Sequence, residues 1–206
     1  FGTNPGLAIL IDGPEAESFV AAARAALAAI GPQTMLTDGI ATAFRQGQAR
    51  IAAGRGVRAL LETDCGQRQA APFLYEVSAT DWLADHSLAE EVFGPLGLII
   101  RARDADEMGR IAHALEGQLT ATLHLDPEDL PLAHCLLHVL ERKAGRIIAN
   151  GFPTGVEVAD AMVHGGPYPA STNFGATSVG TLSIRRWLRP VCYQNLPTEL
   201  LPPVGT

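Results

Sequence analysis

The chain has 206 residues and a formal net charge of −7, from 15 Lys and Arg against 22 Asp and Glu. This length predicts one domain, or one domain with a small appendage. A hydrophobic content of 47% supplies a core and excludes a disordered chain. The acidic balance argues against nucleic acid and anionic membranes as partners, because phosphate binding requires clustered Lys and Arg. The densest apolar run, Leu7 to Ile11, is too short for a transmembrane helix, and the N-terminus does not resemble a signal peptide.

The spacing of cysteine and histidine predicts neither a metal site nor a disulfide framework. Cys65, Cys135 and Cys192 are far apart and odd in number, and the chain has no C-x-x-C motif. A reducing, cytoplasmic location is therefore expected. His134 and His138 stand four residues apart and could share one helix face, but we expect a solvent-facing pair rather than two metal ligands.

The first half of the chain alternates strand and helix signals. A short buried strand at Leu7–Ile11 precedes a helix over 15–30, whose apolar residues recur at intervals of three and four. The Gly-Pro pair that follows ends this helix, since proline cannot continue it. A second helix is expected within 33–56. Further strands are predicted at 57–62, 72–77 and 98–100.

Residues 97–149 are interpreted as two βαβ units that share a strand. Asp104 and Glu107 have capping-box spacing and predict the start of the first crossover helix. Asp126, followed by Pro and Glu, predicts the start of the second helix, and Gly145 is expected to end it. The predicted fold class is therefore α/β, with a mostly parallel sheet and helices on both faces.

The remainder of the chain is less regular. Residues 150–180 are rich in Gly, Pro, Ser and Thr and predict a long irregular segment, a kind of segment that is often functional. The tail from Val191 to Leu196 could add a strand. Three stretches offer polar or aromatic groups beside turn residues and are candidate sites: 1–7, 90–95 and 164–169.

The thiols are a further candidate, because a cysteine with a lowered pKa and a neighbouring base can act as a nucleophile. Cys135 lies on the apolar face of a predicted helix and is expected in the core. Cys192 is expected to be structural, and Cys65 to be exposed. One alternative is therefore an unrelated thiol hydrolase that uses Cys65 with a histidine.

Taken in order, the motifs of this chain resemble the C-terminal half of an aldehyde dehydrogenase. They are T-N-P-G-L from Thr3, E-E-V-F-G-P from Glu90, A-G-R-I-I-A-N from Ala144, and the Gly165-Gly166 loop. The longer stretches N-G-F-P-T-G-V, V-H-G-G-P-Y-P, T-S-V-G-T and L-R-P-V-C-Y-Q resemble the 2-oxoglutarate semialdehyde (2,5-dioxovalerate) dehydrogenase branch. The resemblance covers essentially the whole chain.

The resemblance implies a catalytic domain over 1–188 and an oligomerisation strand and tail over 189–206. It also implies an N-terminal half, absent from this chain, that holds most of the nicotinamide-cofactor site, a general-base glutamate and an oxyanion-hole asparagine. A chain that begins one residue before the nucleophile is expected to be truncated. The implied partners are a small-molecule aldehyde, that N-terminal cofactor domain and further copies in a homo-oligomer.

The family's catalytic cysteine stands immediately before the Thr of T-N-P-G-L, where this chain has Gly2. In the family's reaction a thiolate attacks the aldehyde, a hydride passes to NAD or NADP, and water hydrolyses the thioester. The backbone N–H of Gly2 would still form half of an oxyanion hole, and Phe1 and Thr3 would line the aldehyde's path. Without the thiol, the chain by itself is predicted to be inactive.

The resemblance assigns roles to three further residues. Glu91 matches the acid that hydrogen-bonds the nicotinamide-side ribose, and Phe93 matches the aromatic residue near the nicotinamide ring. His164 takes a place where many family members have an apolar side chain in the substrate pocket, so it would suit a substrate with a carboxylate, such as 2-oxoglutarate semialdehyde. NAD and NADP both stay open. A second alternative is a non-catalytic relative, with Gly2 native and the fold kept for assembly.

Overall fold

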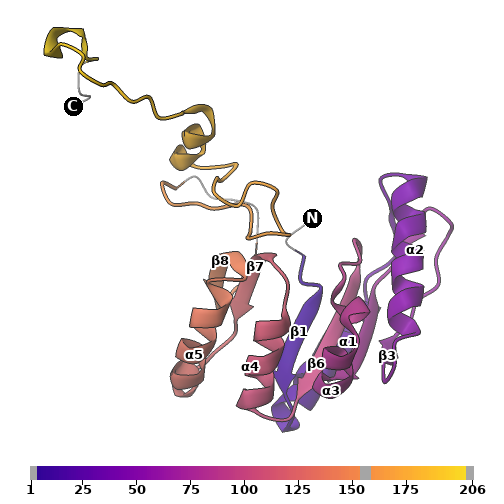
Figure 1. The fold of residues 1–206 in the computed structure, drawn as a ribbon. Coiled ribbons are helices and arrows are strands. Elements are labelled where there is room, and N and C mark those ends of the chain that lie inside the picture. Colours follow the sequence, from indigo (N-terminus) through magenta and orange to yellow (C-terminus); the bar gives the residue numbers. More distant parts are fainter. Residues whose placement is uncertain (1–3, 154–158, 203–206) are drawn as a thin grey trace.

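The structure is a computed structural model that describes residues 4–153 and 159–202 (Figure 1). Phe1, Gly2 and Thr3 therefore lie outside the described residues. The strands are β1 (Leu7–Ile11), β2 (Gln33–Thr34), β3 (Arg58–Leu61), β4 (Gln69–Ala70), β5 (Phe73–Ser78), β6 (Leu96–Ala102), β7 (Gln118–Leu123) and β8 (Ala144–Ala149). The α-helices are α1 (Pro14–Ala28), α2 (Asp38–Ala52), α3 (Ala79–Ala84), α4 (Ala105–Ala114) and α5 (Leu130–Leu140). Short 3-10 helices are η1 (His86–Ala89), η2 (Pro127–Asp129), η3 (Thr181–Trp187) and η4 (Thr198–Leu200).

A four-stranded sheet in the order β1-β6-β5-β3 forms the centre of the fold. β6 pairs in parallel with both β1 and β5, whereas β3 pairs antiparallel with β5. The sequence of β6, L-G-L-I-I-R-A, is almost continuously apolar, as expected for a strand that is covered on both faces. The mainly parallel sheet confirms the predicted fold class.

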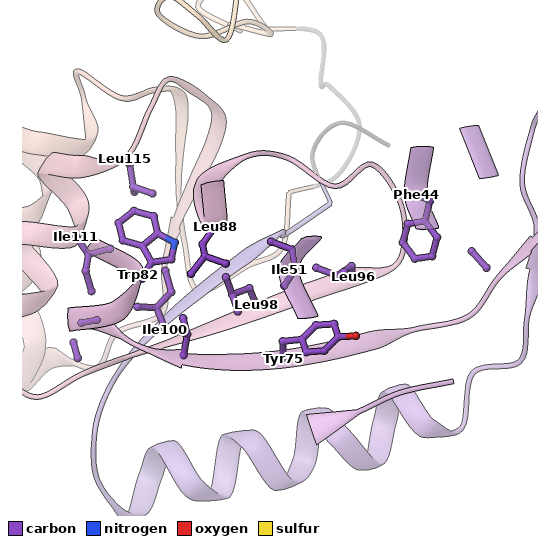
Figure 2. Packing of buried hydrophobic residues seen from close by; sticks show 14 residues of the cluster. Phe44, Ile51, Tyr75, Trp82, Leu88, Leu96, Leu98, Ile100, Ile111 and Leu115 are labelled. Carbon is purple, nitrogen blue, oxygen red and sulfur yellow. The ribbon is translucent and has the colours of Figure 1, made fainter. Parts of the chain in front are cut away.

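Successive side chains of a strand point to opposite faces of the sheet, so each face has its own cluster. On one face Leu98 and Ile100 pack with side chains from α2, α3 and α4, and Figure 2 shows these labelled residues gathered along the strands. On the other face Ile99 packs with Val20 of α1. Helices cover both faces, as predicted.

β7 and β8 form a separate parallel sheet, with α5 as the connection between them. This unit confirms one of the two predicted βαβ units. The other is wrong as stated, because within the described residues β6 and β7 belong to different sheets. The physical reason lies in α4, which buries Ile111 in the cluster of the central sheet and Ala112 in a cluster with α5 and β7–β8. The helix packs against two sheets instead of crossing over one.

The helix ends follow the sequence in part. Asp104 caps α4 by accepting a hydrogen bond from the backbone N–H of Glu107 at 2.8 Å. The Glu107 carboxylate accepts from the backbone N–H of Arg103 at 2.8 Å, one residue before the partner that a capping box requires. The predicted capping box is therefore formed on one side and displaced on the other.

The end of α5 differs from the prediction. The helix ends at Leu140, and Gly145 lies inside β8, so the expectation that Gly145 ends the helix is wrong. The backbone N–H groups of Arg142 and Lys143 bond carbonyls three residues earlier, at 3.1 and 2.9 Å. Such bonds tighten and close a last helical turn, so the helix has ended before the glycine is reached.

Beyond β8 the described residues, 150–153 and 159–202, contain no strand, and their helical turns are η3 and η4. The tail from Val191 to Leu196, which could add a strand, forms none and pairs with no strand among the described residues. Figure 1 shows the tail running away from the central sheet and from the β7–β8 sheet. No helix in the described part of the chain is long and apolar enough to cross a membrane.

Candidate active-site segments

Helix α2 supports the first candidate segment, and its own position is set by a cap and an apolar stripe. Thr37 begins the helix by accepting a hydrogen bond from the backbone N–H of Ile40 at 3.1 Å. Ala41, Phe44 and Ile51 are buried, and Phe44 and Ile51 belong to the cluster of the central sheet. The helix is therefore fixed against that sheet.

We call residues 90–95, which precede β6, the β6 lead-in. The Arg50 guanidinium of α2 donates to the backbone carbonyls of Ser87 and Glu90. It also forms an ion pair with the Glu90 carboxylate at 3.2 Å. Of the two adjacent acids in the E-E-V-F-G-P motif, Glu90 is therefore used to hold the backbone.

Two glycines allow the β6 lead-in to lie close to α2. A Cβ added at Gly47 would stand 2.9 Å from a Val92 methyl, so the Val92 side chain occupies that space. A Cβ added at Gly94 would overlap the Phe44 ring. Val92 and Gly94 therefore face α2, and neither glycine has room for a larger residue.

Glu91 and Phe93 alternate with these inward positions and are exposed. Phe93 retains 53% of its accessible surface, and Glu91 is also exposed. No hydrogen bond or ion pair with another described residue engages the Glu91 carboxylate. Because alternate residues of an extended chain share a side, the lead-in presents a free carboxylate next to an aromatic ring. Such a pair can accept hydrogen bonds from hydroxyls and stack on a flat ligand.

The beginning of β1 lies at the same edge of the central sheet as the β6 lead-in. Leu7 pairs with Leu98, whose backbone N–H donates to the Gly6 carbonyl at 2.9 Å. Residues 4–6 and the lead-in thus enter the sheet at neighbouring positions. The nucleophile position and its two neighbours lie outside the described residues, so their roles stay predictions.

We call residues 162–170 the His164 loop. The Thr177 hydroxyl accepts from the backbone N–H of His164 at 3.1 Å and lies 3.1 Å from the Met162 carbonyl. The Ser178 hydroxyl donates to the His164 carbonyl at 3.2 Å. The His164 side chain is half-buried. The backbone of this residue is therefore fixed through side-chain hydroxyls.

Glycines allow the same loop to rest on the beginnings of β7 and β8. A Cβ added at Gly117 would stand 2.5 Å from the Pro167 carbonyl oxygen, and one added at Gly145 would overlap the carbonyl of Gly165. Gly145, expected as a helix stop, serves instead for close approach of two backbones. The part of the loop that follows His164 is therefore fixed as well.

The structure does not join the two segments directly. No hydrogen bond, ion pair or ring contact among the described residues links Glu91 or Phe93 to His164. Figure 1 shows the beginning of β1 and the orange segment that contains the His164 loop on the same side of the strands, the side from which the tail extends. Each segment is thus prepared separately on its own sheet.

The residues that hold these segments are not predicted by the sequence. Arg50 lies 40 residues from Glu90, and Thr177 lies 13 residues from His164. Contacts over such separations produce no local periodicity. For Thr177 the available signal is the T-S-V-G-T motif, which the resemblance singles out without a role.

Cys65 is one of the residues that line a cavity of about 160 Å³. The Cys65 sulfur lies 3.2 Å from the carbonyl oxygen of Gln69. The lining residues include Arg45, Gln48 and Asp64 but no histidine. A thiol hydrolase would need a base beside the sulfur, so the cavity gives that alternative no support.

Cys135 is exposed on α5, so its predicted place in the core is wrong. Its neighbour Leu136 is buried instead, because adjacent helix positions differ by about 100°. Cys192 is exposed too.

The rings of His134 and His138 lie 5.0 Å apart on the exposed side of α5. The described residues contain no group of three or more potential metal ligands.

Shifted pKa values occur at groups that stabilise the fold. Hydrogen bonds from the side chain and backbone of Arg103 lower the pKa of the Glu107 carboxyl, and they outweigh its desolvation. Burial raises the pKa of the Tyr75 hydroxyl, which accepts from Gln48 at 2.5 Å and lies 3.2 Å from Glu62. These shifts reflect packing of the central sheet and of α4.

Sequence comparisons relate the chain to curated enzymes. No family model matches it. It is 55% identical over 207 residues to alpha-ketoglutaric semialdehyde dehydrogenase 2 of Azospirillum brasilense, covering 98% of this chain and 39% of that protein. It is 44% identical to alpha-ketoglutaric semialdehyde dehydrogenase of Acinetobacter baylyi, covering 99% of this chain and 39% of that protein. The chain thus spans about two fifths of the length of these relatives.

Solved structures share the fold at low sequence identity. The Delta-pyrroline-5-carboxylate dehydrogenase from Mycobacterium tuberculosis bound with NAD has a TM-score of 0.66 and 15% identity, over 95% of this chain and 38% of that one. The NADP-dependent glyceraldehyde-3-phosphate dehydrogenase from Bacillus halodurans C-125 complexed with NADP has a TM-score of 0.61 and 16% identity, over 80% and 34%. At these identities the likeness is one of fold.

Proposed function

We propose, from the premise that this chain corresponds to a portion of an aldehyde dehydrogenase, that the parent protein is built to oxidise 2-oxoglutarate semialdehyde to 2-oxoglutarate with a nicotinamide cofactor. The two curated relatives support the premise, because both are named alpha-ketoglutaric semialdehyde dehydrogenases and match nearly the whole chain at 55% and 44% identity. Alpha-ketoglutaric and 2-oxoglutaric are synonyms. The observation that carries the proposal is the division of the β6 lead-in. Helix α2 holds Glu90, Val92 and Gly94, and it leaves Glu91 and Phe93 free for a ligand.

Glu91 and Phe93 fit one end of a nicotinamide cofactor. An unpaired carboxylate accepts hydrogen bonds from ribose hydroxyls, and an exposed ring two residues later offers an apolar face beside it. The cofactor, when bound, supplies the acceptor for the hydride. The chain's own contribution is orientation, because the backbone of both residues is held by the contacts of their neighbours with α2. NAD and NADP are equally compatible with these two side chains.

His164 is proposed to bind the carboxylate of the oxo-acid. An imidazole N–H donates to a carboxylate in both the neutral and the protonated form. The half-buried position and the fixed backbone of His164 support this role, since a positioned donor loses little freedom when it binds. His164→Phe in an active enzyme is expected to lower kcat/KM for this aldehyde. An unchanged kcat/KM would contradict the role.

Gly2 takes the position of the nucleophile in the resemblance, and we propose that this chain is inactive alone. An active site would also need a thiol and the N-terminal cofactor domain, which we propose as the partner of this chain.

Assembly into a homo-oligomer is proposed from the tail, where Trp187 is 85% exposed. Apolar side chains this exposed are typical of surfaces that another chain or domain covers. Three free thiols fit a reducing compartment such as the cytoplasm.

The test uses the full-length protein that contains this chain, with and without Gly2→Cys, and measures NAD(P)H formation from 2-oxoglutarate semialdehyde. We expect a signal with Gly2→Cys and none without it. Glu91→Gln in the active background should raise KM for the cofactor about tenfold, the cost of one hydrogen bond to a charged group. Glu90→Gln is the matched control, and its cofactor KM should stay within about twofold, because its partner is Arg50.

Gly2 favours a second candidate, a non-catalytic relative whose fold serves assembly. In that case Gly2→Cys gives no NAD(P)H, and the unmodified full-length protein does not bind NAD or NADP in equilibrium dialysis. Binding of either cofactor together with restored turnover would reject this candidate.

A further inference from the structure

Thr177 is one of two buried polar residues of the described chain, with 7% of its surface exposed. The proposed function assigns a role to His164 but none to Thr177. Its hydroxyl lies within hydrogen-bond distance of four backbone groups. These partners offset the cost of burying a hydroxyl and join residues 162–164 to residues 177–179.

The capacity of the Thr177 hydroxyl matches its surroundings. A hydroxyl has one proton to donate and two lone pairs to accept with. Oγ1 accepts from the N–H of His164 at 3.1 Å and from the N–H of Val179 at 3.4 Å. It donates toward the Met162 carbonyl at 3.1 Å, with the Val179 carbonyl at 3.3 Å as the alternative acceptor. One side chain thus ties the backbone on both sides of position 163 to the segment around 178.

The next residue holds the other backbone group of His164. The Ser178 hydroxyl donates to the His164 carbonyl at 3.2 Å. Both polar backbone groups of His164 are therefore bonded to side chains from two consecutive positions, 177 and 178. Because Ser178 is exposed and Thr177 is buried, water can replace the first bond more readily than the second.

The beginnings of β7 and β8 fix the part of the His164 loop that follows His164. Gly145 and Gly117 touch the backbone of Gly165 and Pro167 so closely that added Cβ atoms would collide with their carbonyl oxygens. Residues 162 and 163 approach glycines less closely, since Cβ atoms added at Gly180 and Gly145 would stand 3.3 Å from the Met162 Cβ and from a Val163 methyl. A change at Thr177 would therefore be absorbed first at residues 162–164. The position of the His164 imidazole follows its backbone.

We infer that Thr177 is a positioning residue that sets His164 for the carboxylate of the substrate, and this inference rests on the proposed function. Thr177 itself touches no substrate. Its hydroxyl fixes where the His164 donor stands, so its loss should weaken binding of aldehydes that carry a carboxylate and spare those that do not.

The test measures ligand dissociation constants by titration calorimetry in the full-length protein with Gly2 retained, because without the thiol the aldehyde is not turned over. Thr177→Val keeps the shape and removes the hydroxyl, and Thr177→Ser keeps the hydroxyl. We expect Thr177→Val to raise Kd for 2-oxoglutarate semialdehyde about tenfold and Kd for pentanal less than about twofold. Thr177→Ser should stay within about twofold of the parent for both ligands. Equal losses for the two aldehydes, no loss for either, or a Ser variant as weak as Val would each overturn the inference.

Two measurements keep the result interpretable. If Thr177→Val does not fold, Ser178→Ala removes the second bond to His164 at an exposed position, and it should raise Kd for the semialdehyde alone, by a smaller factor. If the parent protein does not bind the semialdehyde, the proposed function fails, and the imidazole NMR signal of His164 decides the positioning role separately. That signal should shift in Thr177→Val and not in Thr177→Ser, and an unshifted signal in Thr177→Val would reject the role.

Discussion

The central sheet and the His164 loop are held by different kinds of contact. In the sheet, many apolar side chains share the burial, so Leu98 and Ile100 pack among residues from three helices. In the loop, backbone meets backbone at Gly145 and Gly117, and the hydroxyls of Thr177 and Ser178 bond to the backbone of His164. The sheet therefore depends on the amount of apolar surface, and the loop depends on a few positions where one atom decides the geometry.

The largest effect is expected in the sheet. Ile100 is fully buried, and Ile100→Ala would leave a cavity where the central strand meets the helices. We expect the free energy of unfolding to fall by about 3 kcal/mol. Urea denaturation measures this loss, and Ile184→Ala, at a position that is 58% exposed, is the control. Equal losses for the two variants would show that the sheet is not the stable part.

A smaller loss of unfolding free energy, with a local change in hydrogen exchange, is expected where the His164 loop rests on β8. Gly145→Ala places a Cβ on the carbonyl of Gly165, and the backbone cannot yield without leaving β8. Overpacking of this kind costs about 2 kcal/mol. Amide hydrogen exchange should rise in residues 163–170 and not in β6. Gly109→Ala in α4, where a Cβ meets nothing within 4 Å, is the matched control and should be neutral or stabilising.

A third test concerns the carboxylate that fixes the start of α4. The pKa of Glu107 is lowered from its ordinary 4.5 by hydrogen bonds from Arg103. The charged form is therefore the one that stabilises the fold. Its contribution is fully present above pH 4.5 and is lost as the pH falls through the lower folded value. Thermal unfolding of the parent and of Glu107→Gln should differ at pH 7 and converge in acid, and a difference that does not change with pH would contradict this account.

The smallest effect is expected in the tail. Trp187 is 85% exposed, so Trp187→Ser should change the free energy of unfolding of the chain by less than about 0.5 kcal/mol. The same urea series measures it. A loss above about 1 kcal/mol would mean that the tail packs on the sheets in solution, and the contrast between the two regions would then be smaller than described.

Apolar patterns predict the body of this fold well. The strand at Leu7–Ile11 has the predicted bounds. The apolar stripe of the first predicted helix is correct in part, because Ala23 and Leu27 pack toward the central sheet with Val20. Phe19 and Ile30, which the same stripe includes, are exposed. The continuous apolar run of β6 is a direct sign of a strand that is covered on both faces. These features depend on periodicities within one segment, which a single sequence displays.

The errors occur where one residue type has two uses. Gly145 was expected to end a helix, but glycine also serves close backbone approach, and only the position of Gly165 distinguishes the two. The broad apolar stripe of the second crossover helix predicts Cys135 in the core, yet Leu136 fills the buried position and Cys135 is exposed. Residues 191–196 form no strand in the described part of the chain, because a strand requires a neighbouring strand and none pairs with them there.

The candidate site shows the same limit. Glu91, Phe93 and His164 follow from motifs, whereas their supports, Arg50 and Thr177, act across 40 and 13 residues of sequence. Arg and Thr are residue types that also occur commonly at exposed helix and loop positions. The sequence around each residue does not indicate which distant backbone groups it bonds.

In the β6 lead-in, positions that tolerate substitution alternate with positions that do not. Positions 92 and 94 are fitted to Gly47 and Phe44, while the side chains at positions 91 and 93 are exposed. Descendants of this chain could therefore exchange the ligand-facing chemistry by point mutation without a folding penalty. Insertion or deletion of one residue would turn the ligand-facing side chains into the helix, so the length of this stretch is under stricter selection than its exposed residues.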